Sequence, residues 1–550
     1  MADKRKATAG AETAAPGDPT PQDERATAAA GPRRWSAQIS SAMLARLAAR
    51  AAVAEPAETI VVETPFTGET LGEVPAGRPD DVGAAVDTAR RARQAWAQTP
   101  PAARARIVLR FHDLLIRNAR EILDIVQLES GKARRHAYEE VLDVAIQARY
   151  YAHTAEGFLR PRRRQGALPL LTSAREHHRP RGVIGVIAPW NYPLTLAVGD
   201  AIPALLAGNA VVLKPDTQTP YSALLAEALF AEAGLPRNVL QVVTGRGSEL
   251  GEPLIEAADY LMFTGSTATG RIVAAQAASR LKDCSMELGG KNPLLVLPDA
   301  RLGAAVRGAV RGICSNTGQL CISIERVYVH DSVYDAFVPR LAEALRAVRL
   351  GAGLDFVADM GSLSSAGQLA KVQRHVGEAV AKGAEVLAGG HARPDLGPYF
   401  YEPTLLAGVT EEMALRRDET FGPVAAVYRC SSVDEMVRGA NDSEYGLNAS
   451  VWTRDVRLGR EIAASIEAGT VNINEAYAAT WASASPMGGF KQSGLGRRHG
   501  EAGILKFTEA QSVAAQRVLA IDTPPFLDHE TYWTVMSQAI RVLKHVPGIK

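Results

Sequence analysis

The sequence predicts an α/β fold with two parallel sheets in separate domains. Its 550 residues are too many for one ordinary hydrophobic core. Short runs rich in Val and Ile alternate with helical patterns over residues 182–278, and a second set of such runs lies within residues 293–473. Strand, helix and strand at this spacing are typical of βαβ units, in which helices connect parallel strands.

The chain before the first sheet is predicted to be mainly helical. Residues 1–33 are rich in Ala, Thr, Pro, Gly and charge, and we expect them to form a disordered tail. Apolar residues then recur at helical spacing in four segments, which are 36–53, 79–99, 101–129 and 135–159.

The two alternating series define the predicted sheets. In the first series we expect strands at 182–188, 210–214, 239–244 and 260–264, and helices at 195–206, 219–233, 248–257 and 266–278. In the second series we expect strands at 293–297, 326–330, 423–428, 449–452 and 470–473. Open α/β sheets bind ligands at strand carboxyl ends and between domains, which points to the boundary near residues 287–291.

Three segments belong to neither sheet. Residues 166–181 have a polar, extended pattern, and residues 490–516 follow a glycine-rich loop and lead into a candidate strand at 511–518. These two segments could pair with each other or with another subunit. Residues 531–546 carry apolar side chains at helical spacing, and we expect a helix packed on the body or on a partner subunit. The alternatives are a membrane-surface helix and a cover over the entrance of a site.

Composition argues against several classes of function. Lys and Arg number 61 against 60 Asp and Glu, which gives no support for a nucleic-acid or anionic-membrane partner. The four cysteines show no CxxC spacing, so we expect neither a disulfide scaffold nor a metal site, and the chain fits a reducing cytoplasm. We expect no signal peptide and no transmembrane segment, because the sequence lacks the apolar stretch that either requires.

One cysteine and one glutamate carry the candidate chemistry. Cys321 lies in the run NTGQLCIS, and Glu287 lies 34 residues upstream in the run MELGGKNP. A thiolate can attack a carbonyl carbon, and a carboxylate can then activate the water that frees the product. The pair therefore indicates nucleophilic catalysis.

Seven motifs, in this order, resemble those of the aldehyde dehydrogenase superfamily over about residues 63–512. They are PWNYP at 189–193, KP at 214–215, FTGS at 263–266, ELGGK at 287–291, GQLC at 318–321, ETFGP at 419–423 and PMGGFKQSG at 486–494. The resemblance implies a variant Rossmann NAD(P)-binding domain (34–165 and 182–288) and a catalytic domain (289–488). It further implies a small oligomerisation β-segment (166–181 and 489–519), followed by a C-terminal extension with an amphipathic helix (520–550). A homodimer or homotetramer is the oligomer typical of this family.

The resemblance also assigns the catalytic residues. Cys321 is similar to the nucleophile that converts the aldehyde into a thiohemiacetal and then a thioester. Asn191, with the backbone N–H of Cys321, matches the oxyanion hole, and Glu287 matches the base that activates water for hydrolysis. The remaining cysteines better suit small buried side chains, namely Cys284, Cys314 and Cys430.

The cofactor positions follow from the same resemblance. The run TGRGSELG at 244–251 gives G-x-G-x-x-x-G, one residue longer than the usual dinucleotide fingerprint. Its glycines allow close backbone approach, and the following helix N-terminus favours phosphate. The cofactor contacts so implied are Ile187, Pro189, Trp190, Lys214, Thr217, Gly247, Phe263, Thr264, Gly265, Ser266, Leu288, Glu419 and Phe421.

Thr217 bears on the choice between NAD and NADP. NAD-preferring relatives often carry Glu three residues after the matching lysine, where it binds the ribose 2′-hydroxyl. Here a neutral hydroxyl stands beside Lys214, and it would not repel a 2′-phosphate. The sequence therefore favours NADP, with NAD as the alternative, and an inward-pointing Asp216 would weaken this preference.

The substrate is an aldehyde of uncertain type. The overall pattern looks like a bacterial subgroup usually named succinate-semialdehyde dehydrogenase (NADP+), which makes succinate semialdehyde the first expectation. However, the positions of two carboxylate-binding arginines are occupied by Gly199 and Ser315, and a second cysteine is replaced by Ser323. Either other groups bind a carboxylate, or the substrate is a less polar aliphatic or aromatic aldehyde. The candidates for the first case are Arg311, Ser483 and Ser485, and those for an apolar funnel are Leu194, Ile322 and Trp481.

Three other functions are less consistent with the residues. A CoA-acylating relative generally lacks the glutamate of the ELGGK motif, which is Glu287 here. A non-catalytic scaffold predicts the loss of Asn191, Glu287 or Cys321, and all three are present. A non-redox thiol hydrolase leaves the dinucleotide loop and the ETFGP motif without a role.

Overall fold

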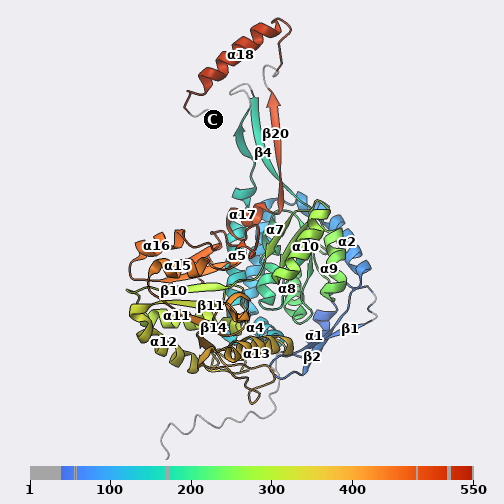
Figure 1. Cartoon of the computed structure of the whole chain (residues 1–550). Coiled ribbons are helices and arrows are strands. Elements are labelled where there is room, and N and C mark those ends of the chain that lie inside the picture. Colours follow the sequence, from blue (N-terminus) through green and yellow to red (C-terminus); the bar gives the residue numbers. More distant parts are fainter. Residues whose placement is uncertain are drawn as a thin grey trace, which may run out of the picture. The chain divides into compact units, whose positions relative to one another are not determined.

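The computed structural model describes residues 39–54, 56, 58–166, 172–477, 481–516 and 522–547. The unit described here lies within residues 39–550 (Figure 1). The predicted tail at 1–33 lies outside the described residues. No helix of the described residues is both long enough and apolar enough to cross a membrane.

The N-terminal region is mainly helical, as predicted, but it also contains a hairpin. The helices are α1 (Ser41–Ala48), α2 (Pro79–Gln98), α3 (Pro101–Arg117), α4 (Ala119–Ser130) and α5 (Arg134–Leu159). The antiparallel strands β1 (Thr59–Glu63) and β2 (Thr70–Pro75) were not predicted. The prediction of one continuous helix over 101–129 is wrong, because Asn118 ends α3. Its side-chain amide donates to the carbonyl of Leu114 at 2.8 Å.

The first sheet has six strands in the order β19-β9-β8-β5-β6-β7. Five of these are parallel, namely β5 (Val183–Ile187), β6 (Ala210–Lys214), β7 (Leu240–Val242), β8 (Tyr260–Thr264) and β9 (Cys284–Glu287). The short β19 (Gly494–Leu495) pairs antiparallel with β9. The helices connecting these strands are α6 (Pro193–Val198), α7 (Ala201–Leu206), α8 (Pro220–Glu232), α9 (Gly247–Ala257) and α10 (Thr267–Ser279).

One predicted helix of this sheet is broken. Residues 195–206 form α6 and α7 rather than a single helix. Pro203 explains the break, because proline has no N–H to donate to the carbonyl of Gly199 and its ring collides with that carbonyl in a continuous helix. The break leaves Gly199 and Asp200 at the junction.

The second sheet has seven strands in the order β12-β13-β14-β11-β10-β16-β17. They are β10 (Asn292–Val296), β11 (Ile324–His330), β12 (Glu385–Ala388), β13 (Thr404–Ala407), β14 (Val424–Cys430), β16 (Asn448–Trp452) and β17 (Thr470–Ile473). All pair in parallel except β12 with β13. The helices of this region are α11 (Leu302–Cys314), α12 (Asp331–Arg346), α13 (Ala366–Ala381), α14 (Ala414–Arg417), α15 (Val433–Asn441) and α16 (Val456–Ala464). The two-sheet α/β fold is thus confirmed, whereas β12 and β13 were not predicted.

The two segments outside the sheets do pair with each other. Strands β3 (Arg162–Gln165), β4 (Thr172–Pro180) and β20 (Thr508–Gln516) form an antiparallel sheet in the order β20-β4-β3 (Figure 1). Pairing runs from Thr508 with Pro180 to Gln516 with Thr172. A role of this sheet in self-association stays a prediction, as does the division into functional domains. The last two residues of the strand predicted at 511–518 lie outside the described residues.

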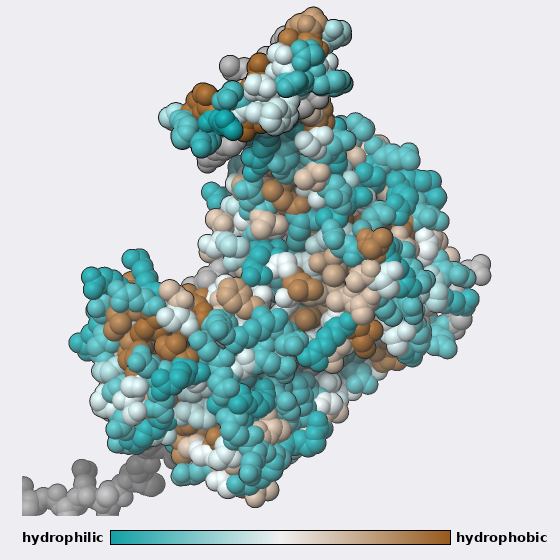
Figure 2. Space-filling model, turned by 45° about the horizontal axis from the view of Figure 1, so that its top comes forward, coloured by the Kyte–Doolittle hydropathy of each residue, from teal (hydrophilic) through white to brown (hydrophobic). Residues whose placement is uncertain are grey.

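The predicted C-terminal helix is observed as α18 (His529–Leu543). Its described side chains include none that is buried, so packing on the body is not observed. Apolar side chains such as Trp533 and Ile540 are exposed on it, at 69% and 63% of their surface. Figure 2 shows apolar and hydrophilic side chains interspersed over this C-terminal segment.

The remaining short elements complete the surroundings of the site. They are the 3₁₀ turn η2 (Ser315–Gly318), the paired strands β15 (Tyr445–Gly446) and β18 (Phe490–Lys491), and α17 (Gly500–Leu505). Because η2 leads directly to Cys321 and β9 ends at Glu287, the carboxyl end of the first sheet faces the loop that carries the cysteine.

Candidate active site

Cys321 lies in a tight loop between η2 and β11. Asn316 and Thr317 adopt left-handed backbone angles, with φ of 49° and 58°, which are uncommon for residues with a side chain. At Gly318, where φ is +70°, an added Cβ would meet the carbonyl oxygen of Gly422 at 2.0 Å. Strain and close packing of this kind are typical of loops that hold a reactive group in place.

The thiol of Cys321 is protonated at neutral pH. Burial, together with the carboxylates of Glu287 and Glu419, raises its pKa to about 12 against the opposing charge of Arg498. A thiol with this pKa acts as a nucleophile only when its proton is removed. Cys321 lines a pocket that is described below, whereas Cys284, Cys314 and Cys430 are absent from the residues that line it.

Glu287 is the candidate base. It ends β9, and only 2% of its surface is exposed. Among the described residues neither carboxylate oxygen has a hydrogen-bond partner. Burial raises its pKa to about 7, against the opposing charges of Arg498 and Lys506. A carboxyl group with this pKa can both accept and release a proton near neutrality.

Asn191 is tied to the loop that carries Cys321. Its side-chain amide donates to the carbonyl of Gln319 at 3.1 Å, two residues before Cys321. The carbonyl of Asn191 in turn accepts from the side-chain amide of Asn316 at 2.8 Å. An amide nitrogen carries two N–H groups, so one remains for an oxygen at the reacting carbon.

A buried ion pair holds the Asn191 loop from behind. Lys132 pairs with Glu140 and also donates to the carbonyl of Asn191 at 2.7 Å. Glu140 accepts the backbone N–H groups of Leu194 and Thr195 at 2.8 and 3.0 Å, at the start of α6. Sequence analysis missed this pair, because two charges eight residues apart usually indicate an exposed helix face.

On the cofactor side, Lys214 and Gly247 lie together. Lys214 ends β6 and is 4% exposed, and burial lowers the pKa of its amine. A Cβ added at Gly247, the first residue of α9, would lie 3.6 Å from Lys214 Nζ. An ammonium beside a helix N-terminus suits a phosphate or a phosphorylated ribose. Thr217 follows β6 and is half-buried, while Asp216 accepts the backbone N–H of Gln218 at 3.0 Å.

A second buried ion pair positions Glu419 and Phe421. Glu325 pairs with Lys291 and accepts the backbone N–H groups of Thr420 and Phe421, each at 2.9 Å. Glu419 accepts the N–H of Gly290 at 2.8 Å, beside the ELGGK motif. The ring of Phe421 packs edge-on against that of Trp190, with centroids 5.5 Å apart.

The other predicted cofactor positions gather at the same end of the first sheet. Ile187 and Phe263 are adjacent in register on β5 and β8, and Ser266 caps the start of α10. The remaining ones, also at or just past these strand ends, are Pro189, Thr264, Gly265 and Leu288. Their cofactor roles stay predictions.

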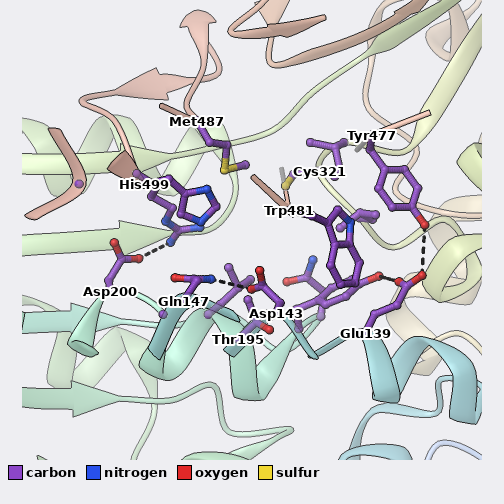
Figure 3. A pocket seen from close by; sticks show the side chains of 18 of the residues that line it. Glu139, Asp143, Gln147, Thr195, Asp200, Cys321, Tyr477, Trp481, Met487 and His499 are labelled. Carbon is purple, nitrogen blue, oxygen red and sulfur yellow. Dashed lines mark hydrogen bonds and ion pairs between the residues drawn. The ribbon is translucent and has the colours of Figure 1, made fainter. Parts of the chain in front are cut away.

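A pocket of about 830 Å³, part of it open to solvent, lies over Cys321. Figure 3 shows Cys321 and Met487 on one side and Asp143, Thr195 and Glu139 on the other. Its lining comprises Glu139, Asp143, Gln147, Tyr151, Asn191, Tyr192, Thr195, Leu196, Gly199, Asp200, Pro203, Leu320, Cys321, Ile322, Tyr477, Trp481, Met487, Arg498, His499 and Gly503.

The structure separates the expected substrate contacts into two groups. Ile322 and Trp481 line the pocket, but Leu194 does not. The candidate carboxylate binders Arg311, Ser483 and Ser485 are also absent from the lining. Arg311 is directed instead to Glu475, at 3.0 Å, and to the hydroxyl of Tyr477.

Sequence analysis missed most of the charged groups in the pocket. Glu139 and Asp143 project from α5, and burial raises the pKa of each carboxyl group. Asp200 and Arg498 form a buried ion pair at 2.7 Å. No motif joins these residues, because they come from separate helices and a C-terminal loop.

Comparison with known proteins identifies the family. Residues 52–513 match the family model described as the aldehyde dehydrogenase family. The chain belongs to this family. It is therefore an oxidoreductase that acts on aldehydes.

Similar proteins are bacterial. A protein of Mycolicibacterium smegmatis named "Putative succinate-semialdehyde dehydrogenase (NADP+)" is 52% identical over 488 residues, which cover 88% of this chain and 94% of that protein. The phenylacetaldehyde dehydrogenase of Pseudomonas fluorescens is 38% identical over 84% of this chain and 93% of its own length. The structure of an aldehyde dehydrogenase from Bacillus cereus in complex with NAD+ is 36% identical, with a TM-score of 0.80, covering 84% of this chain and 93% of that one.

Replacing Lys132 by methionine should destabilise this aldehyde dehydrogenase by about 3–5 kcal/mol, because Glu140 would remain buried without its cation. Denaturant unfolding followed by circular dichroism measures the loss. The matched double variant Lys132→Met/Glu140→Gln removes both charges and should recover part of it. A single variant as stable as the wild type would contradict a structural role for the pair.

Proposed function

We propose that this enzyme oxidises an uncharged aliphatic or aromatic aldehyde to the carboxylic acid, with NADP+ preferred over NAD+, through a thioester on Cys321. The observation that carries the proposal is the arrangement at the end of β9. Cys321 and the anchored Asn191 line one pocket, and the buried Glu287, whose carboxylate has no hydrogen-bond partner among the described residues, is close enough to raise the pKa of the Cys321 thiol.

Attack on the aldehyde forms the first covalent bond. The sulfur of Cys321 bonds to the carbonyl carbon, and the thiol proton passes to water in the pocket. The carbonyl oxygen becomes an oxyanion, which the free N–H of Asn191 and the backbone N–H of Cys321 stabilise. One donor of this kind is worth about 3 kcal/mol in the transition state.

A dinucleotide fits the cradle on the other side of Cys321. Lys214 and the N-terminus of α9 suit its phosphate or ribose, while Glu419 and Phe421 are held at the nicotinamide end. When bound, NAD(P)+ supplies the hydride acceptor that turns the thiohemiacetal into a thioester. The neutral Thr217 leaves room for a 2′-phosphate, and Asp216 is engaged with the backbone of its own turn.

Hydrolysis then releases the acid. The carboxylate of Glu287 takes a proton from water as the water oxygen bonds to the thioester carbon, and it later releases that proton to solvent. The carbon–sulfur bond breaks, and Cys321 recovers a proton as the carboxylic acid leaves. The pKa of about 7 at Glu287 suits this alternation of accepting and releasing protons.

The charges in the pocket support an uncharged substrate. Its lining carries three carboxyl groups, those of Glu139, Asp143 and Asp200, and one guanidinium, that of Arg498. Because Arg498 is already paired with Asp200, a substrate carboxylate finds no unpaired cation among the described lining residues. An anion in such a pocket loses hydration without compensation. The name of the Pseudomonas relative, a phenylacetaldehyde dehydrogenase, agrees with this class.

Succinate semialdehyde is the second candidate. The name of the Mycolicibacterium relative, at 52% identity, favours this substrate, and the NADP+ in the same name agrees with the proposed cofactor. The two candidate substrate classes differ in whether the aldehyde carries a carboxylate, so a comparison of kcat/KM values separates them directly.

An aldehyde panel with both cofactors tests the proposal. Butanal and phenylacetaldehyde should each show a kcat/KM at least about tenfold above that of succinate semialdehyde, because a tenfold ratio needs only about 1.4 kcal/mol of unpaired desolvation. NADP+ should be used at least as well as NAD+. A preference for succinate semialdehyde would establish the second candidate, and a tenfold preference for NAD+ would refute the role given to Thr217.

A further inference from the structure

Arg498 is a buried cation that the proposed mechanism does not yet use. Only 9% of its surface is exposed. One terminal nitrogen, Nη2, lies 2.5 Å from the hydroxyl of Thr264 and 2.7 Å from a carboxylate oxygen of Asp200. Its Nε–H has no hydrogen-bond partner among the described residues. The guanidinium is therefore fixed in position but keeps one free donor.

Strand register places this guanidinium beside Glu287. Thr264 on β8 pairs directly with Glu287 on the parallel strand β9. Side chains at paired positions of neighbouring strands point to the same face of a sheet. On the far side of β9, Gly494 pairs with Glu287, and the chain then returns to bring Arg498 onto Thr264. Arg498 and Glu287 thus share one face.

The unpartnered atoms of the two residues are complementary. Glu287 has two carboxylate oxygens without donors, and Arg498 has one N–H without an acceptor. Buried polar groups in proteins are rarely left unpaired, so each such group calls for an explanation. A direct bond after a small rotation, or a bridging water, would satisfy both.

We propose that Arg498 is the positioning residue of the general base. Held by Asp200 and Thr264, its guanidinium provides the fixed positive charge that keeps the carboxylate of Glu287 deprotonated and directed toward Cys321. This inference rests on the proposed role of Glu287 and adds the group that tunes it.

The surrounding charges agree with this role. Arg498 and Lys506 are both bonded to Asp200, so two cations share one anion and leave one positive charge. The carboxylate of Glu287 balances that charge. Burial alone would raise the pKa of Asp200, but the two cations lower it to about 2, so it remains an anchor at any working pH. Arg497 also favours the charged form of Glu287, to a smaller extent than Arg498 and Lys506.

Replacing Arg498 by methionine tests the inference through a pH profile. Removing an opposite charge at short range raises a carboxyl pKa by about one unit or more. The rising limb of kcat should therefore move at least about one pH unit upward, and kcat at pH 7 should fall about fivefold or more and recover at higher pH. The burst of reduced cofactor should persist, because acylation does not use Glu287 as its base.

Two further variants keep the test decisive. Arg497→Met removes the same charge one residue away, where the side chain bonds the carbonyls of Gly489 and Gly496, and its profile should shift much less than that of Arg498→Met. Arg498→Lys retains the charge and should restore most of the profile, which a purely structural role for the guanidinium would not predict. If Arg498→Met fails to fold, the comparison of Arg498→Lys with Arg498→Gln supplies the same readout.

The outcomes separate this inference from the proposed function. If Glu287→Gln stalls after a burst but Arg498→Met keeps the wild-type pH profile, the inference about Arg498 is wrong and the base assignment stands. If Glu287→Gln turns over normally, the base assignment itself fails. In the double variant Glu287→Gln/Arg498→Met, the effect of Arg498→Met on the pH profile of kcat should disappear, because no carboxylate remains at position 287.

Discussion

Cys321→Ala should reduce dehydrogenase turnover by at least about a thousandfold, since no other group can form the covalent intermediate. Reduced cofactor, followed by its absorbance, measures turnover. Cofactor binding should survive, because Lys214, Gly247 and Glu419 lie on other loops. A thermal shift on adding NADP+ checks that the variant remains folded.

The neighbouring cysteines provide the control. Cys284 is half-buried on β9, three residues before Glu287, and Cys284→Ala should keep activity within about twofold of the wild type, as expected of a small side chain away from the pocket. Residual activity above a tenth in Cys321→Ala, or a comparable loss in Cys284→Ala, would overturn the identity of the nucleophile.

Glu287→Gln should separate the two halves of the reaction. Glutamine has nearly the same shape but cannot accept a proton, so the thioester should form and then persist. We expect a burst of reduced cofactor close to one per active site and a steady-state kcat lower by about 10²–10⁴-fold. In the wild type, kcat should rise with pH through about 7, because the deprotonated form of Glu287 grows over that range.

Glu419 offers a matched comparison for this variant. It is also a buried glutamate whose pKa is raised to about 7, by burial and by Glu325. However, it accepts the N–H of Gly290 and was assigned to the cofactor. Glu419→Gln should therefore change the KM for NAD(P)+. Unlike Glu287→Gln, it should not produce a burst of reduced cofactor followed by a stall. Full steady-state activity in Glu287→Gln would refute the base assignment.

Local sequence patterns were enough to predict the two parallel sheets. Buried parallel strands are continuous apolar runs, as in residues 210–214, and such runs are visible without tertiary information. The hairpin of β1 and β2 and the edge strand β12 are short and partly exposed, and β13 has only four residues, so all four strands carry a weak signal. The helix break at Asn118 depends on one side-chain hydrogen bond, and the break at Gly199 depends on Pro203. Neither feature changes the spacing of the apolar residues, so the pattern alone does not predict the breaks.

The catalytic residues could be proposed from motifs, but their supporting charges could not. Lys132 with Glu140, and Arg498 with Asp200, are pairs formed only by folding. Arg498 and Asp200 are almost 300 residues apart, and neither position carries a pattern that suggests its partner. For the same reason, the pocket's excess of carboxyl groups became visible only in three dimensions.

The most direct test of the account is the mass of the covalent intermediate. Glu287→Gln, mixed with aldehyde and NADP+ and then quenched in acid, should gain the mass of one acyl group, and peptide mapping should place it on Cys321. Cys321→Ala in the same background should gain nothing. An unmodified chain after the burst, or an acyl group on Cys284, Cys314 or Cys430, would contradict the thioester mechanism.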